Sequence, residues 1–347
     1  MQDNIKKNTY NTIDLFKFIF SLFVVAIHIP PFTSVSTPLH FFTLYLSRLA
    51  VPFYFICSGY FLFKKSTSNI YKYVYRIFKL YVIWSIIYLP CVLHSAIVNK
   101  ANIAITLTKW FKSFVFVGSY IHLWYLLATV VAVLIVAFCL KMRLSIKSIL
   151  ILSCIFYIIG LIPQTYSFLL DPIRKCESIF LLLKFIQKII VTTRNGLFEG
   201  FLFISLGMLF ARKYLSIKIK HAAILFLASM FFLGCELIVV RFAGWARAYD
   251  LFIFLAPASF FLFYIVKTKQ LKNRAIYTKL RTLSSLIFFS HLLIEYILNI
   301  VLTPVLPELW SYSLFRYTLV IIATLGFSLC VMTLSKKPHF TWLKNIY

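Results

Sequence analysis

Long apolar runs alternate along the chain with short polar segments that are rich in lysine and arginine. A helix needs about 20 mainly apolar residues to cross the hydrocarbon core of a bilayer, and ten runs come close to that length. The pattern therefore predicts an all-α membrane protein with about ten transmembrane helices. We expect them at residues 13–31, 39–63, 77–98, 122–140, 147–162, 196–211, 221–240, 247–266, 284–303 and 314–334.

The domain organisation is expected to be simple. The sequence shows no internal repeat, no low-complexity tract and no linker rich in Gly, Ser or Pro. We therefore expect one transmembrane domain over residues 1–347. The first apolar run contains Asp14, Lys17 and His28 and has no small-residue cleavage site, so we expect a retained span and not a signal peptide.

Composition supports the membrane prediction. Hydrophobic residues make up 62% of the chain and charged residues only 13%, whereas soluble domains usually carry about 25% charged residues. The net charge is +27, but the basic residues punctuate the apolar runs and do not form one polar face. We therefore assign them to anionic lipid in a bilayer and not to nucleic acid.

The distribution of the 36 Lys and Arg residues predicts the orientation. They gather in every second connection, beginning with the N-terminal segment, and cytoplasmic loops of membrane proteins carry such an excess. Both termini are therefore expected in the cytoplasm. The longest outer connection, 163–195, contains a mixed apolar and basic stretch at 174–188. Its spacing suits a helix on the outer membrane surface or a roof over an outward-facing cavity.

Several kinds of chemistry are disfavoured by missing motifs. The seven cysteines are odd in number and show no CxxC spacing, so we expect neither a disulfide framework nor a metal site. The sequence has no Walker glycine loop, GxGxxG, HExxH or GxSxG. Nucleotide hydrolysis, zinc proteolysis and serine-hydrolase chemistry are therefore disfavoured.

Polar residues in the first predicted span follow one helical stripe. Asp14, Lys17, Ser21 and His28 recur at spacings that place them on one face. Lys17 and His28 are expected about 16 Å apart along the helix axis, with the cation near the cytoplasm and the imidazole near the outside. Because polar groups facing lipid are costly, this face should meet a protein interior or a water-filled cavity. His28 alone could also be a structural histidine bonded to a backbone carbonyl.

Other polar residues are expected in the outward halves of the spans. His28 and Glu199 should each lie about one turn below the outer surface. A carboxylate beside an imidazole orients the ring and increases its basicity, as a general base requires. The alternative is that Glu199 neutralises Arg194 or Arg48. The outward group also includes His122, Glu236 and a possible pair of His291 and Glu295, one turn apart, which would do chemistry or lock helices together.

A basic face precedes the third predicted span on the cytoplasmic side. Lys72, Arg76 and Lys79 are spaced four and three residues apart. Arginine and lysine bind phosphate as well as lipid headgroups. The face therefore indicates either phosphate binding or lipid anchoring.

Four segments of the sequence resemble the acyltransferase-3 family of membrane proteins. IDLFKFIFSLFVVAIH (13–28) and SRLAVPFYFICSGYFLFKK (47–65) are similar to the opening of these proteins, whose first span carries a basic residue, ten further residues and a histidine. HLWYL (122–126) and TRNGLFEGFLFISLG (193–207) are similar to phrases in the membrane half of the serine/alanine racemases of glycopeptide-resistance operons, which belong to the same family. The resemblance spans essentially the whole chain.

The resemblance implies a function and a set of site residues. Family members transfer acyl groups, mostly acetyl, from cytoplasmic acyl-CoA to hydroxyls of extracytoplasmic glycans or other acceptors, and a bacterial plasma membrane is implied. The family's intramembrane histidine falls on His28, and its partner arginine on Lys17. The family's RxxR falls on Arg76 and Lys79. At two of these positions lysine replaces arginine, which keeps the charge but loses the bidentate fork.

The stripe and the resemblance together suggest a mechanism. Arg76, Lys79 and Lys17 would hold the phosphates of acetyl-CoA while its pantetheine arm reaches outward. His28, oriented by Glu199, would deprotonate the acceptor hydroxyl or take the acetyl group transiently. Arg48, His122, Arg194 and His291 would support the substrates.

Transport is the rival function. Intramembrane charges also mark solute pathways, and the racemase-like relatives make uptake of a serine-like amino acid the main alternative. We find neither an inverted repeat nor paired spans broken by Gly or Pro, which disfavours a transporter. A catalytically inactive scaffold is disfavoured because His28 is retained.

Overall fold

The computed structural model describes residues 10–64, 69–174, 180, 181, 185 and 191–347. These residues form helices and connecting loops and contain no strand. Seven helical spans in this part of the chain are long and apolar enough to cross a membrane, at Asn11–His28, Thr37–Lys64 (two consecutive helices), Ile70–Val98, Trp124–Lys141, Ile219–Phe242, Ala275–Val305 and Ser313–Leu334. Two shorter apolar helices lie at Ile146–Leu161 and Leu255–Thr268. The prediction of an all-α polytopic membrane protein is confirmed.

Each of the ten predicted spans coincides with one helix or with two adjoining helices. The elements are α1 (Asn11–His28), α2 (Thr37–Ser47), α3 (Ala50–Lys64), α4 (Ile70–Val98), α5 (Ile103–Phe116), α6 (Trp124–Lys141), α7 (Ile146–Leu161), η2 (Ser167–Leu170), α8 (Asp171–Arg174), the π-helical turn η3 (Gly196–Gly200), α10 (Phe201–Arg212), α11 (Ile219–Phe242), α12 (Leu255–Thr268), α13 (Ala275–Val305), α14 (Pro307–Ser311), α15 (Ser313–Leu334) and η4 (Pro338–Ile346). Most of the stretch predicted as a surface helix, 174–188, lies outside the described residues.

Two predicted spans are interrupted or shortened for identifiable reasons. The run at 39–63 is divided between α2 and α3, because Pro52 lacks an N–H and its ring would clash with the carbonyl of Arg48, four residues earlier. The run at 247–266 becomes helical only at Leu255. Just before this residue, the backbone N–H groups of Ile253 and Phe254 donate to the Glu236 carboxylate, at 2.7 and 3.0 Å. These N–H groups are therefore not used for helical hydrogen bonds to preceding carbonyls.

The chain packs as two compact units. The first unit comprises residues 1–50 and 261–345 together with Tyr347, and the second comprises 51–260 together with Ile346. Their relative placement is not determined, and each is described by itself. The expectation of a single domain stays a prediction.

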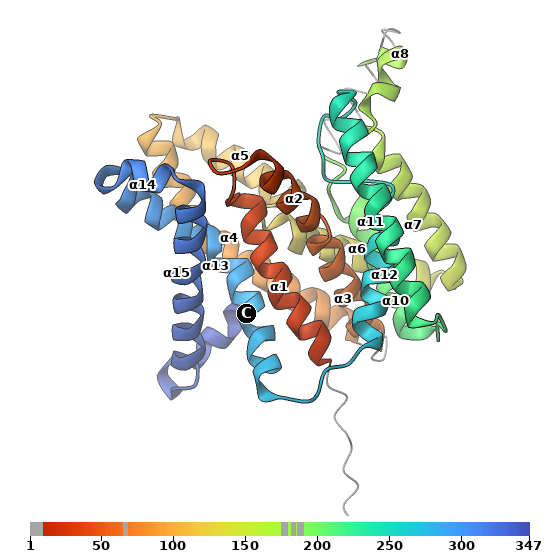
Figure 1. Cartoon of the computed structure of the whole chain (residues 1–347). Coiled ribbons are helices and arrows are strands. Elements are labelled where there is room, and N and C mark those ends of the chain that lie inside the picture. Colours follow the sequence, from red (N-terminus) through yellow and green to blue (C-terminus); the bar gives the residue numbers. More distant parts are fainter. Residues whose placement is uncertain (1–9, 65–68, 175–179, 182–184, 186–190) are drawn as a thin grey trace, which may run out of the picture. The chain divides into compact units, whose positions relative to one another are not determined.

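The first unit is built around α1, α13 and α15, which lie side by side (Figure 1). Its core contains Val25, Ile29, Leu283, Ile287, Trp310 and Val320. At one end, the hydroxyls of Ser34 and Ser313 lie 2.6 Å apart, and each also accepts from the backbone N–H of the other residue. At the other end, Asn11 and Thr12 bind the loop before α13. Both ends of α1 are thereby fixed against α13 and α15.

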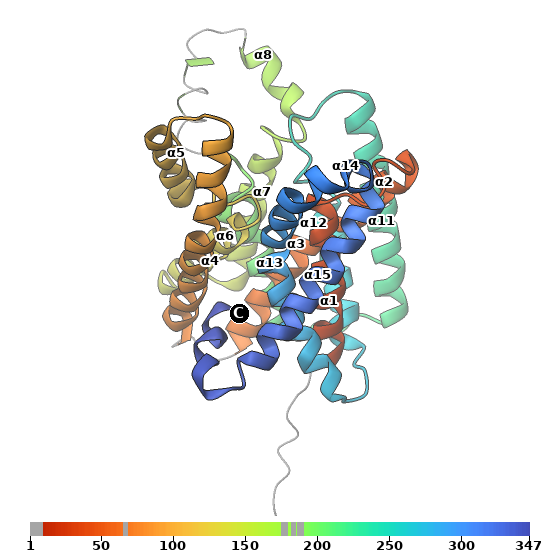
Figure 2. The ribbon, with the colours of Figure 1, turned by 90° about the vertical axis from the view of Figure 1, so that its left-hand side faces the viewer.

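The second unit is built from α3 to α11 and the start of α12. Figure 2 shows α5 and α6 next to α4, and the Tyr81 hydroxyl of α4 donates to the Phe114 carbonyl of α5 at 2.6 Å. Elsewhere in the unit, α3 and α10 cross at Gly59 and Gly207. A Cβ atom on Gly59 would collide with the Ile204 carbonyl, and one on Gly207 with the Ile56 carbonyl. Glycine is therefore needed at both positions for the two backbones to approach.

Candidate functional site

The polar stripe of α1 turns toward α13 in the first unit. Asp14 is buried, and its carboxylate lies 3.8 Å from the Arg281 guanidinium of α13. Asp14 also interacts electrostatically with Lys17, one turn along the same helix. The end of the stripe that is nearer the N-terminus is therefore a small charged cluster, with two cations around one carboxylate.

The other end of the stripe carries two histidines. His28 is the last residue of α1, and its ring centroid lies 5.5 Å from that of His291 on α13. His291 is fully buried, and its Nδ1 lies 3.0 and 2.9 Å from the carbonyl oxygens of Ile287 and Phe288. Because a carbonyl only accepts, Nδ1 must carry a hydrogen, and the neutral ring then has its lone pair on Nε2. Nε2 of this tautomer is a hydrogen-bond acceptor, on a ring that lies next to the His28 ring.

Glu295 has a contact that the sequence did not predict. The Glu295 carboxylate forms an ion pair with Arg316 of α15, and its pairing with His291 stays a prediction. The Arg316 guanidinium also lies over the Trp310 ring, 5.3 Å from its centroid. The indole N–H of Trp310 in turn donates to Asn299 Oδ1 at 2.8 Å. This cluster fastens α13 to α14 and α15 one turn beyond the two histidines.

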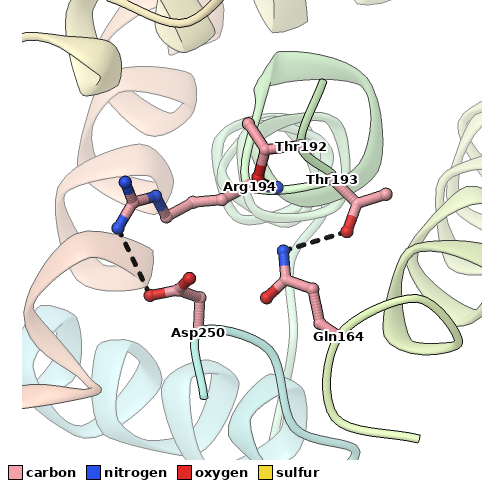
Figure 3. A network of polar contacts seen from close by, with 5 residues as sticks. All are labelled: Gln164, Thr192, Thr193, Arg194 and Asp250. Carbon is pink, nitrogen blue, oxygen red and sulfur yellow. Dashed lines mark hydrogen bonds and ion pairs between the residues drawn. The ribbon is translucent and has the colours of Figure 1, made fainter. Parts of the chain in front are cut away.

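A second polar cluster lies in the second unit and is drawn in Figure 3. Arg194 Nη1 is 3.4 Å from Asp250 Oδ1, and both side chains are partly exposed. The Arg194 guanidinium also lies over the Trp124 ring, with its Cζ 5.0 Å from the ring centroid. Two phrases that carry the family resemblance, 122–126 and 193–207, therefore meet at this point. Sequence analysis missed Asp250, because no local pattern indicates a contact with Arg194, which is 56 residues away in the sequence.

Gln164 completes this second cluster. Its amide nitrogen donates to Thr193 Oγ1 at 2.9 Å, and Thr193 donates to the Gly160 carbonyl. Gln164 is 5% exposed, and within the described part of the chain its Oε1 has no hydrogen-bond partner. Figure 3 shows this oxygen on the side of the amide that faces Asp250. Sequence analysis also missed Gln164, because a single glutamine in a loop belongs to no motif.

Glu199 lies in the π-helical turn η3 and is buried. The preceding Asn195 caps this turn, since its Oδ1 accepts from the N–H groups of Leu197 and Phe198. Arg194 forms an ion pair with Asp250, and its alternative pairing with Glu199 stays a prediction. His28 and Glu199 belong to different units, so their pairing stays a prediction.

Glu236 has a structural role in the second unit. Besides two backbone N–H groups at the start of α12, its carboxylate accepts a hydrogen bond from the Tyr166 hydroxyl at 2.5 Å. Burial and this hydrogen bond raise the pKa of Tyr166. Glu236 thus ties the 162–170 connection to α11 and α12.

The remaining predicted site residues are described within their own units. His122 precedes α6 and is buried, and its ring centroid lies 5.1 Å from that of Tyr88. Arg48, in the first unit, is half-buried at the junction of α2 and α3. Lys72, Arg76 and Lys79 are exposed on the first turns of α4. Lys17 belongs to the first unit and Arg76 and Lys79 to the second, so their joint phosphate site stays a prediction.

The helices and clusters define a multi-pass membrane protein with polar groups inside its helical units. Residues 10–333 match the model of the acyltransferase domain family. The chain therefore belongs to this acyltransferase family.

Similar proteins are racemases of enterococci. An amino-acid racemase of Enterococcus faecalis is 27% identical over 345 residues, which cover 95% of this chain and 47% of the relative. A second amino-acid racemase of E. faecalis is 32% identical over 58% of this chain and 28% of its own length. A serine/alanine racemase of Enterococcus gallinarum is 28% identical over 73% of this chain and 36% of its own. The chain thus spans less than half the length of these relatives. No solved structure matches.

Proposed function

We propose that the protein is an acyltransferase of the bacterial plasma membrane that moves an acyl group, acetyl in the first instance, from cytoplasmic acyl-CoA to a hydroxyl of an extracytoplasmic glycan. The observation that carries the proposal is membership of the acyltransferase family over residues 10–333. The adjacent rings of His28 and His291 support it, because acyl transfer to a hydroxyl needs a base.

His28 is the proposed centre of the chemistry. It takes the proton of the acceptor hydroxyl while the hydroxyl oxygen attacks the thioester carbonyl. The C–S bond then breaks, and the CoA thiolate recovers the proton. In the other variant, His28 carries the acetyl group for one step before the acceptor takes it. His291 and Glu199 orient the His28 ring in either variant.

Donor binding is assigned to cations at the other end of the helices. Acetyl-CoA is too polar to cross a bilayer, but its pantetheine arm is long and thin. We assign its phosphates to Lys17, Arg76 and Lys79, because cationic side chains form strong charge-assisted bonds to phosphate. The arm then points along α1 toward His28. Arg48, His122 and Arg194 remain assigned to the acceptor side.

A reconstituted transfer assay tests this function. The full chain is placed in liposomes, labelled acetyl-CoA is supplied on one side and a polysaccharide with free hydroxyls on the other. The proposal expects label in an ester linkage on the polysaccharide, released by mild alkali. Absence of label with acetyl-CoA and with longer acyl-CoA donors would contradict acyl transfer.

Amino-acid uptake is the second candidate, and the Arg194 cluster favours it. Arg194 would bind a carboxylate, while Asp250 and the buried Gln164 Oε1 would accept hydrogen bonds from an ammonium group. The named activities of the enterococcal relatives concern amino acids, including serine and alanine. The same liposomes, given labelled serine, test this candidate. Uptake that Arg194→Gln abolishes and Arg241→Gln does not would favour transport over acyl transfer.

A further inference from the structure

The segment that joins α12 to α13 in the first unit is strongly basic. The connection itself carries Lys269, Lys272 and Arg274. Further cations lie in the last turn of α12 (Lys267) and the first turns of α13 (Lys279 and Arg281). Residues 251–294 contain no Asp or Glu, and Asp14 is the one carboxylate of residues 10–50. Lys269, Lys272 and Arg274 are exposed. The segment is thus a concentrated positive patch with little internal compensation.

The backbone of this patch is tied to the first turn of α1. Asn11 Nδ2 donates to the carbonyls of Leu271 and Lys272, at 3.2 and 3.1 Å. Thr12 Oγ1 donates to the Lys269 carbonyl and accepts from the Leu271 N–H at 3.1 Å. Asn11 and Thr12 are themselves buried. The backbone that carries the exposed cations is therefore fixed by hydrogen bonds to α1.

The hydrogen bonds from Asn11 and Thr12 also bring the patch close to the charged end of the α1 stripe. Thr12, which holds the loop, is close along α1 to Asp14 and Lys17, and Asp14 is already engaged by Arg281 and Lys17. The loop cations are therefore not needed to neutralise Asp14. In addition, the first turn of α13 begins at Ala275, and its N–H groups add partial positive charge next to Arg274.

A loop that serves only to set membrane orientation needs positive charge but no fixed shape. Buried side chains that fix the loop reduce the entropy lost when several cations converge on one anion. A ligand with several negative charges in a small volume gains most from such an arrangement. Phosphate groups meet this description and form strong charge-assisted bonds with Lys and Arg.

We propose that residues 269–274, together with Lys17 and Arg281, form a binding site for a phosphate-bearing ligand. This rests on the proposed function where the ligand is the donor: the nucleotide end of acyl-CoA carries a 3′-phosphate and a pyrophosphate, and the site adds further cations to those already assigned to these phosphates. The headgroup of an anionic lipid offers the same chemistry from a second source. Both ligands engage the same cations, and experiment separates them.

The test measures binding and not turnover, so its outcome is independent of acyl transfer. The full chain in zwitterionic-lipid nanodiscs is titrated with adenosine 3′,5′-bisphosphate, and in a second arm phosphatidylglycerol is exchanged into the discs. The site is expected to bind one of the two in a salt-dependent manner. Lys272→Gln with Arg274→Gln should weaken that binding at least tenfold. The matched control is Lys336→Gln with Lys337→Gln, an exposed basic pair of the same unit, which should change it less than twofold.

A further pair of variants tests the tie itself. Thr12→Val removes the hydroxyl that holds the loop and should weaken phosphate binding. Thr12→Ser keeps the hydroxyl and should bind phosphate as the wild type does.

Binding of the bisphosphate assigns the site to a nucleotide, and binding of phosphatidylglycerol alone assigns it to lipid. If the wild-type protein binds neither probe, or if both Gln pairs weaken binding equally, the proposed site is wrong. Bisphosphate binding without acyl transfer would contradict the proposed function and leave the phosphate site intact.

Discussion

At the scale of single residues, the two histidines are the most informative feature of the first unit. His28 was expected from the sequence because it ends a polar stripe on an apolar helix. His291 was expected only as a supporting residue, because its distance from His28 along the chain hides their contact. The structure brings the two rings to 5.5 Å, so His291 becomes a candidate for orienting His28.

Replacing His291 with asparagine should separate structure from chemistry. The asparagine amide can still donate to the carbonyls of Ile287 and Phe288, so the fold should be retained, but the ring and its Nε2 acceptor are lost. We expect kcat for acyl transfer to fall by about 10²-fold, as for loss of a residue assisting proton transfer, with a nearly unchanged KM for acetyl-CoA. Steady-state kinetics and a melting curve check this. Full activity of the asparagine variant would show that His291 only fills the core and bonds to the backbone.

At the scale of elements, the sequence located the helices well and their interruptions poorly. Ten apolar runs became helices because backbone groups in a bilayer must bond within a segment. The 247–266 run was expected as helix throughout, but Glu236, distant in sequence, takes the N–H groups of Ile253 and Phe254. Helix α5 was missed because its short run contains Lys109 and Lys112. Asp250 and Gln164 were missed for a related reason, since contacts between distant segments leave no local pattern.

The crossing of α3 and α10 gives a prediction at this scale. Gly207→Ala should force the two helices apart, because the added Cβ collides with the Ile56 carbonyl. We expect it to destabilise the fold by roughly 1–3 kcal/mol, the range for overpacking a core. The matched control is Gly326→Ala on α15, where a Cβ would meet no atom within 4 Å. Thermal unfolding in detergent should show a lower midpoint for the first variant only. Equal midpoints would contradict the close crossing.

At the scale of the whole molecule, the chain is a multi-pass membrane protein of an acyltransferase family, and it spans less than half the length of its racemase relatives. Its basic residues predict how it is oriented. The excess of Lys and Arg in alternate connections predicts that both termini and the loops near Lys213 and Lys272 lie in the cytoplasm. The connections near Ser36 and Glu308 are predicted outside.

Cysteine accessibility in a cysteine-free background checks this orientation. Single cysteines at Lys213 and Lys272 should react with a membrane-impermeant maleimide only after the membrane is opened. Cysteines at Ser36 and Glu308 should react in intact cells. Labelling of position 213 in intact cells would contradict the predicted orientation and, with it, the side from which acyl-CoA is supplied.

The central claim is that His28 performs acyl transfer at the far end of α1 from the charged cluster around Asp14. The most direct measurement is the rate of label transfer from acetyl-CoA to a hydroxyl acceptor by His28→Ala in liposomes. The control is His221→Ala, an exposed histidine on the first turn of α11. We predict a rate 10²–10⁴-fold below the wild type for the first variant, with normal insertion and melting, and a normal rate for the control. A correctly folded His28→Ala protein that transfers acetyl groups at the wild-type rate would contradict the account.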